Sequence, residues 1–505
     1  MPNRAPAYAL LAGLAGLWLG NGPVSAQEPL SAIDWLSRTP AMALTNEPPV
    51  VDTAALPVVD VRPLDAPGRD AVGLLPGRTT GLPDSLWQAS HSDDLVRKIH
   101  ALPANLLPAM QGLLYTLLLA EANPPLDAST ADKLLIARID RLIDLGALEP
   151  AAALLERAGP TTPELFRRWF DVTLLMGQED TACIALMAQP HLAPDYRARV
   201  FCTSRTGDWT GATTTLYSAR ALGLISADND LLLARFLDPE LFEGEPPLPV
   251  PTAPDPLTFR LYEAIGEALP TRLLPRQYAH ADLRSTAGWK AQLEAAERLA
   301  HSGAIQPNRL LGVFTARRPA ASGMIWDRVA AIQALDVALA GGDNRQVSDS
   351  LPDAWEAMKQ SRLEVAFSEL FAPELARAKL NGPATHIAYN MTLLSSDYER
   401  AARSGARVDF ARAIALGAPP DRAKGGTEKA IAAAFRSTNP PAQIKQMLAD
   451  GKLGEVLLEA MATFEQGADG DNAALEDALA TFRFVGLEDI ARRAALQVLL
   501  LDRNG

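Results

Sequence analysis

The sequence has few of the residues that build redox, metal or nucleotide sites. Only two cysteines occur in 505 residues, and they form no Cys-x-x-Cys pair that would indicate thiol exchange or zinc binding. No two histidines lie three or four residues apart, so the His-Glu-x-x-His spacing is missing. The Gly-Lys-Ser/Thr phosphate loop and the Gly-x-Ser-x-Gly nucleophile turn are also missing. We therefore predict no catalytic residues, no cofactor and no metal.

Basic runs and aromatic residues are scarce as well. The formal net charge is −13, and an acidic chain without a basic patch is a poor candidate for binding nucleic acid. Aromatic residues make up 6% of the chain, within a hydrophobic content of 48% that is rich in Ala and Leu. Little of this content alternates as it does in strands, so the composition favours an all-α fold.

Only the N-terminus carries a long apolar run. Arg4 precedes an apolar stretch over residues 7–19, and Val24-Ser25-Ala26 offers small residues for cleavage. This pattern predicts a signal peptide at 1–26 and a periplasmic location, with an uncleaved N-terminal anchor as the alternative. We expect no transmembrane span in the mature chain, because no later stretch is long and apolar enough.

Three turns of the same pattern follow one another in the first half of the chain. Each has Gly, four residues and then Ala, and the glycines are 31 and 30 residues apart. Gly ends a helix readily, and an early Ala lets the next helix pack closely. A fixed period with amphipathic helices on both sides predicts an α-solenoid of antiparallel helix pairs. The turn residues are Gly146 and Ala151, Gly177 and Ala182, and Gly207 and Ala212.

These turns resemble those of the tetratricopeptide repeat, in which Gly, a polar residue, an aromatic residue and Ala mark the turn between helices. Gly207-Asp208-Trp209-Thr210-Gly211-Ala212 fits best, residues 146–151 place Leu148 in the aromatic position, and residues 177–182 fit only at their ends. The period is shorter than the family's value of about 34 residues. The resemblance implies an architecture rather than an activity.

In broad outline the chain also looks like the exported α-superhelix of soluble lytic transglycosylases. The catalytic domain of that family carries a Glu-Ser dipeptide, and no Glu in this sequence precedes a Ser. Any kinship would therefore be limited to the non-catalytic superhelix.

Cys183 and Cys202 flank a turn between two predicted helices, at similar heights on an antiparallel pair. A disulfide fits this geometry and an exported chain. Two buried free thiols are the alternative.

Proline marks the predicted domain limits. Residues 27–84 are Pro-rich and predict an extended linker, followed by a helical-repeat domain at 85–244. Six prolines over residues 245–256 predict either a stiff linker or a strap lying over the helices. Residues 257–505 then form a second all-α domain, in which residues 354–371 predict one helix.

Taken together, these features predict an exported, non-enzymatic helical-repeat scaffold that binds a protein or peptide partner in the cell envelope. One alternative is an accessory of a peptidoglycan enzyme, with peptidoglycan as a possible partner; another is a periplasmic accessory of the flagellar motor. Five tryptophans are candidates for interface residues, although tryptophans in such positions are more often core or groove-wall residues: Trp169, Trp209, Trp289, Trp326 and Trp355.

Overall fold

The computed structural model describes residues 68–128, 131–319, 321–404, 409–437 and 439–501. Within these ranges the regular elements are all helices, and the one β interaction is an isolated bridge between Leu75 and Ala120. The prediction of an all-α fold is confirmed. The predicted signal peptide at 1–26, and residues 27–67 of the predicted linker, lie outside the described residues.

The first half of the chain contains short helices joined by short turns. Its elements are η2 (Arg69–Ala71), α1 (Gly77–Thr80), α2 (Ser92–Ala101), α3 (Pro108–Leu119), α4 (Lys133–Asp144), α5 (Leu148–Ala158), α6 (Pro163–Met176), α7 (Glu179–Ala188), η3 (Pro190–Leu192), α8 (Tyr196–Arg205), α9 (Trp209–Ala221), α10 (Ala227–Leu237) and η4 (Pro239–Phe242).

The second half is helical to its end. Its elements are α11 (Pro256–Ala264), η5 (Thr271–Leu273), η6 (Arg276–Tyr278), α12 (Ala279–Asp282), α13 (Trp289–Ala300), α14 (Pro307–Thr315), α15 (Ile325–Ala340), α16 (Asn344–Gln360), α17 (Glu364–Leu375), α18 (Pro383–Leu394), α19 (Tyr398–Ser404), α20 (Phe410–Ala415), α21 (Gly425–Arg436), α22 (Ala442–Ala449), α23 (Leu453–Ala468), α24 (Asn472–Phe484) and α25 (Glu488–Leu500).

The three predicted turns share one geometry. They join α4 to α5, α6 to α7 and α8 to α9, and their glycines have φ values of 78°, 73° and 88°. In each turn the glycine N–H donates to the carbonyl three residues back, and the next N–H donates to the carbonyl five residues back. This pair of bonds satisfies carbonyls at the helix end and needs a left-handed residue. Ala151, Ala182 and Ala212 are fully buried where the following helix packs.

A turn with the same bonds but without glycine divides a helix that the sequence predicts as continuous. The predicted single helix at 354–371 is wrong, because α16 ends at Gln360 and α17 begins at Glu364. Arg362 has a φ of 55°, and the N–H groups of Arg362 and Leu363 make the same two bonds as at the glycine turns. An arginine thus occupies the left-handed position, so no glycine marked the helix end in the sequence.

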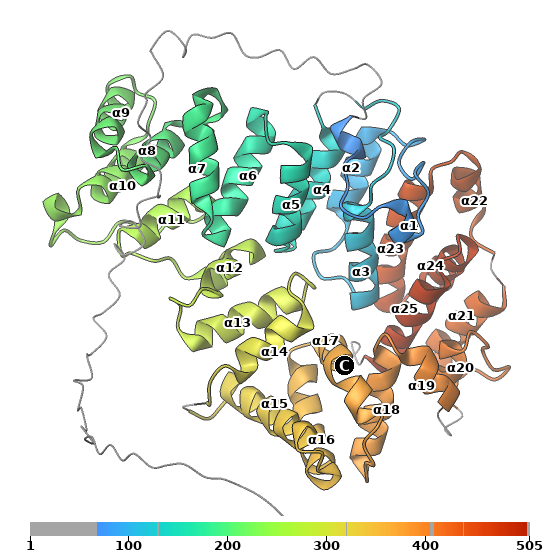
Figure 1. Ribbon diagram of the computed structural model, residues 1–505. Helices are drawn as coiled ribbons and strands as arrows, with labels where there is room; N and C mark the ends of the chain where they lie inside the picture. Colours follow the sequence, from blue (N-terminus) through green and yellow to red (C-terminus); the bar gives the residue numbers. More distant parts are fainter. Residues whose placement is uncertain (1–67, 129–130, 320, 405–408, 438, 502–505) are drawn as a thin grey trace, which may run out of the picture.

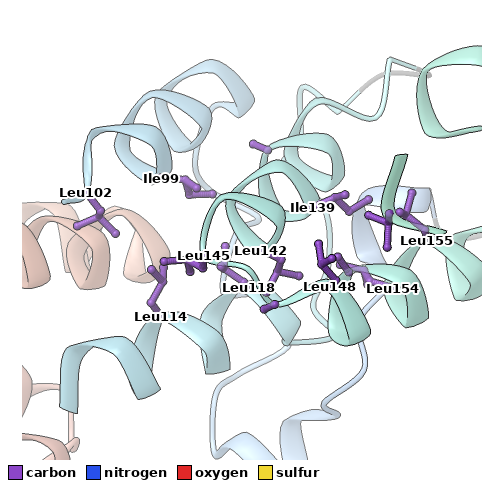
Figure 2. Packing of buried hydrophobic residues seen from close by; sticks show 14 of the residues in the cluster. Ile99, Leu102, Leu114, Leu118, Ile139, Leu142, Leu145, Leu148, Leu154 and Leu155 are labelled. Carbon is purple, nitrogen blue, oxygen red and sulfur yellow. The ribbon is translucent and has the colours of Figure 1, made fainter. Parts of the chain in front are cut away.

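The buried apolar residues form two large clusters, one that joins the helices of the first half to the last helices and one within α12–α18. Figure 2 shows part of the first cluster, in which Ile99, Leu118, Leu142 and Leu154 come from α2, α3, α4 and α5 and lie against one another. The same cluster continues to α23, α24 and α25. Helix pairs packed side by side are the arrangement that the predicted α-solenoid requires.

The two ends of the described chain meet. In Figure 1 the helices follow one another around a circuit that brings α23 and α25 beside α2 and α3. Lys98 on α2 pairs with Glu459 on α23 at 2.8 Å, and the N–H of Ala109 donates to Gln497 Oε1 on α25 at 2.8 Å. Gly454 allows this approach, because a Cβ there would lie 2.3 Å from the ring of Trp87. Closure distinguishes this arrangement from an open solenoid, whose terminal helices touch only one neighbour.

The cysteines form the predicted disulfide. Cys183 on α7 and Cys202 on α8 are bonded, with their Cα atoms 4.9 Å apart. The bond joins the second helix of one pair to the first helix of the next.

The Pro-rich segment 245–256 lies over α10 and α11 as a strap. Leu248 is buried, and its N–H donates to Glu267 at 2.7 Å. The hydroxyl groups of Tyr262 and Tyr278 donate to the carbonyls of Pro249 and Pro254. One hydrophobic cluster includes residues on both sides of this segment, so the helices before and after it share a core.

Residues 68–84, at the end of the predicted linker, pack against α3 and α4. Gly73 has no room for a side chain, because a Cβ there would lie 2.4 Å from the backbone of Ala120. The carboxylate of Asp70 accepts a bond from the N–H of Leu135 at 2.7 Å.

Candidate partner-binding surface and central cavities

Large apolar side chains reach the surface mainly at one end of the first half of the chain. Of fourteen exposed large hydrophobic residues in the described part of the chain, nine lie between residues 184 and 250. This clustering along the chain sets the region apart, because exposed apolar residues scattered singly over a surface are ordinary. We call these nine residues the apolar end: Ile184, Met187, Trp209, Tyr217, Leu222, Leu224, Leu231, Leu241 and Val250.

Helix α9 forms much of the apolar end. Only Ala212, Leu216 and Ala219 of its thirteen residues are buried, so most of the helix surface faces outward. Tyr217 is 57% exposed, and Leu222, which follows the helix, is 70% exposed. In Figure 1, α9 and α10 lie at the far end of the first half, away from the junction of α2 with α23. Among the described elements, none covers the exposed residues of α9.

An aromatic row anchors Trp209 at this surface. The rings of Phe201 and Phe236 stack with centroids 5.8 Å apart, and Trp209 lies 6.2 Å from Phe236. Trp209 is 40% exposed. A partly exposed aromatic side chain held by packed neighbours has the character of an interface anchor.

The other four candidate tryptophans serve the core. Trp169 and Trp289 are buried, and Trp289 donates its Nε1–H to the carbonyl of Val313 at 2.9 Å. Trp326 packs against Trp289 with ring centroids 5.2 Å apart, and Trp355 packs against Phe367 at 6.4 Å. Of the five, the structure therefore brings only Trp209 into the apolar end.

The sequence reasoning missed the remaining members of the apolar end. Leu222 and Leu224 flank Gly223, just after the helix of the third turn. The sequence did contain a signal for them. The buried stripe of α9 consists of Ala212, Leu216 and Ala219. Tyr217 and Leu222 lie outside this stripe, which indicates that they are exposed.

Two cavities lie beside Asn105 and His301, and only the first is also lined by residues from the end of the chain. The first has a volume of about 280 Å³ and includes Asn105, His301, Arg362, Glu465 and Asp469 in its lining. The second has a volume of about 440 Å³ and shares Asn105 and His301 with the first. Its charged lining residues are Arg276, Arg298, Arg328, Glu294 and Glu297.

The carboxylates in each cavity come from a single helix or its end. Glu465 and Asp469 belong to the end of α23, and Glu294 and Glu297 belong to α13. Glu297 is bound by Arg328, with Nε 2.5 Å and a second nitrogen 3.0 Å from its two oxygens. A pair of carboxylates from different helices facing one another, which would favour acid–base chemistry, is not found in either cavity within the described residues.

Glu465 has the most strongly perturbed carboxyl group in these cavities. Burial raises its pKa from 4.5 to about 7, partly offset by the N–H of Leu107, which donates to Oε1 at 3.1 Å. Because the folded protein holds this proton more tightly than the unfolded chain, Glu465 lowers the stability as the pH rises from about 4.5 to about 7.

Replacing Glu465 with Gln should remove this pH dependence. The amide oxygen can still accept the bond from Leu107, but it carries no charge to desolvate. We expect the stability of Glu465→Gln relative to wild type to increase by about 2 kcal/mol from pH 5 to pH 8. This is less than the free energy that corresponds to the whole pKa shift, because the side chain is partly exposed. Urea unfolding at the two pH values measures this gain. A parallel Glu476→Gln variant, altered at an exposed position on α24, should show no such gain; equal behaviour of the two variants would contradict the assignment.

The histidines and acidic residues of the described ranges are side chains of the kinds that metal ions need as ligands. Within the described ranges, no three His, Cys, Asp or Glu side chains come together in a group that could hold a metal ion. His280 has a structural role, because its Nε2 bonds the carbonyl of Gly146 at 2.6 Å and burial lowers its pKa. None of the described helices is long and apolar enough to cross a membrane.

Comparisons with known proteins found no similar protein with which these surfaces and cavities can be compared. No family model, curated protein or solved structure matches the chain.

Proposed function

We propose that this protein is an exported, non-enzymatic scaffold that binds a protein or peptide partner in the cell envelope through the apolar end. The observation that carries the proposal is that nine exposed large hydrophobic residues lie on α7, α9 and α10, on the turn between α9 and α10, and on the segment that follows α10. A hydrophobic surface of this kind, with a partly exposed tryptophan held at its base, gains most of its binding free energy from a few anchor residues.

The disulfide and the rigid helical frame support this proposal. A disulfide such as Cys183–Cys202 is stable in an oxidising compartment, which agrees with the export signal predicted at the N-terminus. The bond joins α7, which carries Ile184 and Met187 of the apolar end, to α8, and a stiff frame reduces the entropy lost on binding. The tetratricopeptide-like turns would then serve as the frame that presents this surface.

Removing apolar side chains from α9 and from the turn that follows it tests the proposal. Tyr217→Ser, Leu222→Ser and Leu224→Ser, made together, replace three side chains that are each more than half exposed. We expect this variant to keep its stability and to lose at least tenfold in partner capture from an envelope extract, because exposed positions contribute little to folding.

The matched control changes three exposed apolar residues outside the apolar end: Met324→Ser, Val337→Ser and Phe484→Ser. It should capture the partner as wild type does. Equal capture by the two variants would refute the proposed site. Cell-wall clearing by the purified wild-type protein in a zymogram would refute the non-enzymatic assignment.

A further inference from the structure

Seven of the nine residues of the apolar end lie in an acidic stretch of the chain. Residues 207–250 carry seven acidic and two basic residues, a net charge of −5 in 44 residues, whereas the whole chain of 505 residues carries −13. The seven are Asp208, Asp228, Asp230, Asp238, Glu240, Glu243 and Glu245.

The two arginines in this stretch are already engaged. Arg220 Nε lies 3.3 Å from Asp230. Arg235 is buried and lies 3.1 Å from Glu267, with a further bond to the carbonyl of Pro246 at 2.9 Å. Neither arginine can therefore neutralise the other carboxylates.

Two more of the acidic residues have local structural tasks. Asp208 accepts the N–H of Gly211 at 2.8 Å and so caps α9. Asp238 accepts the N–H of Leu241 at 3.3 Å and caps η4. Four exposed or half-exposed carboxylates remain, and none of them makes an ion pair or a side-chain hydrogen bond with any described residue: Asp228, Glu240, Glu243 and Glu245.

These four carboxylates are interleaved with the apolar side chains. Glu240 and Glu243 flank Leu241, which is 72% exposed, and Asp228 lies between Leu224 and Leu231 along the chain. An apolar surface bordered by uncompensated negative charge is complementary to a segment with apolar anchors and Lys or Arg around them.

We propose that the occupant of the apolar end is a cationic amphipathic segment of another protein. This inference rests on the proposed function and specifies the partner of the same surface. A second copy of this chain fits poorly, because an isologous contact would place the same carboxylates opposite one another. An anionic membrane surface fits poorly for the same electrostatic reason.

Two synthetic peptides test the proposal directly. Each has about 18 residues, roughly five turns of helix, with leucine on one face. The other face carries lysine in the first peptide and glutamate in the second. We expect the full-length protein to bind the lysine peptide at least tenfold more tightly than the glutamate peptide at low salt. The preference should weaken at about 1 M salt, where the screening length falls to about 3 Å.

A charge variant locates the effect. Glu240→Gln, Glu243→Gln and Glu245→Gln, made together, should weaken binding of the lysine peptide by about tenfold. The matched control is Asp349→Asn, Asp353→Asn and Glu374→Gln, which removes three exposed charges on α16 and α17. The control should bind the lysine peptide as wild type does.

The outcomes separate this inference from the proposed function. Equal affinity for the two peptides, preference for the glutamate peptide, or no binding of either would overturn the cationic partner. So would tight binding to vesicles of anionic phospholipid, or equal losses in the two charge variants. If the α9 serine variant nevertheless loses capture of the natural partner, the proposed function holds while the inference on charge fails.

Discussion

Replacing Arg138 with Met is expected to destabilise the protein by about 3–5 kcal/mol. Arg138 is fully buried, and its guanidinium donates to the carbonyls of Leu118 at 2.7 Å and Ala120 and Val72 at 2.8 Å, with a longer bond to the carbonyl of Asp70. Methionine fills similar space but donates to none of these carbonyls. Each buried carbonyl then loses its partner, at a cost of about 1–3 kcal/mol where water cannot replace it.

Urea unfolding followed by circular dichroism measures this loss. Arg157→Met serves as the control, since Arg157 is half exposed and contacts Glu121 only at 3.4 Å; its loss should be below about 1 kcal/mol. Hydrogen exchange should also become faster at Leu74 and Leu75, whose N–H groups bond Leu119 beside the Arg138 site. If Arg138→Met is as stable as Arg157→Met, Arg138 does not hold residues 69–75 against α3 and α4.

Removing the disulfide is expected to cost about 3 kcal/mol, because the bond closes a loop with a sequence separation of 19 residues and so restricts the unfolded chain. Cys183→Ala together with Cys202→Ala removes the bond with the smallest change in packing at two buried positions. The melting temperature and the free energy of unfolding of this variant should match those of reduced wild-type protein.

Each single variant, Cys183→Ala or Cys202→Ala, serves as a check on packing. If the loss comes from the bond, either single variant should lose as much as the double variant, and the double variant should lose little more. Mass spectrometry of the unreduced protein should show both thiols blocked. Alkylation of both cysteines without reduction would contradict the bond.

The local features of the fold could be predicted, because they depend on neighbouring residues. Gly146, Gly177 and Gly207 marked helix ends through their freedom to adopt positive φ. The heights of Cys183 and Cys202 on adjacent helices were enough to predict their pairing. The turn at Arg362 was not predicted, because a residue other than glycine occupies the left-handed position there.

The long-range features could not be predicted, since no local pattern encodes them. The contact of α2 with α23 joins Lys98 to Glu459 across 361 positions in the sequence. Nothing in the local sequence marks Arg138 on α4 for burial, which four carbonyls from other segments allow. Of the apolar end, only Trp209 was proposed from sequence. Which side of α9 stays uncovered depends on the packing of α8 and α10.

Site-specific crosslinking in cells tests the central claim, partner binding at the apolar end, most directly. A photoreactive amino acid placed at Leu222, 70% exposed, is compared with one at Val337, 67% exposed on α15. Position 222 should give one dominant crosslinked protein with a basic amphipathic segment at the site of attachment. The photoreactive amino acid at position 337 should not give this crosslinked protein. The product from position 222 should disappear when Tyr217→Ser and Leu224→Ser are present in the same chain. The same products at both positions, or no product at position 222, would contradict the account.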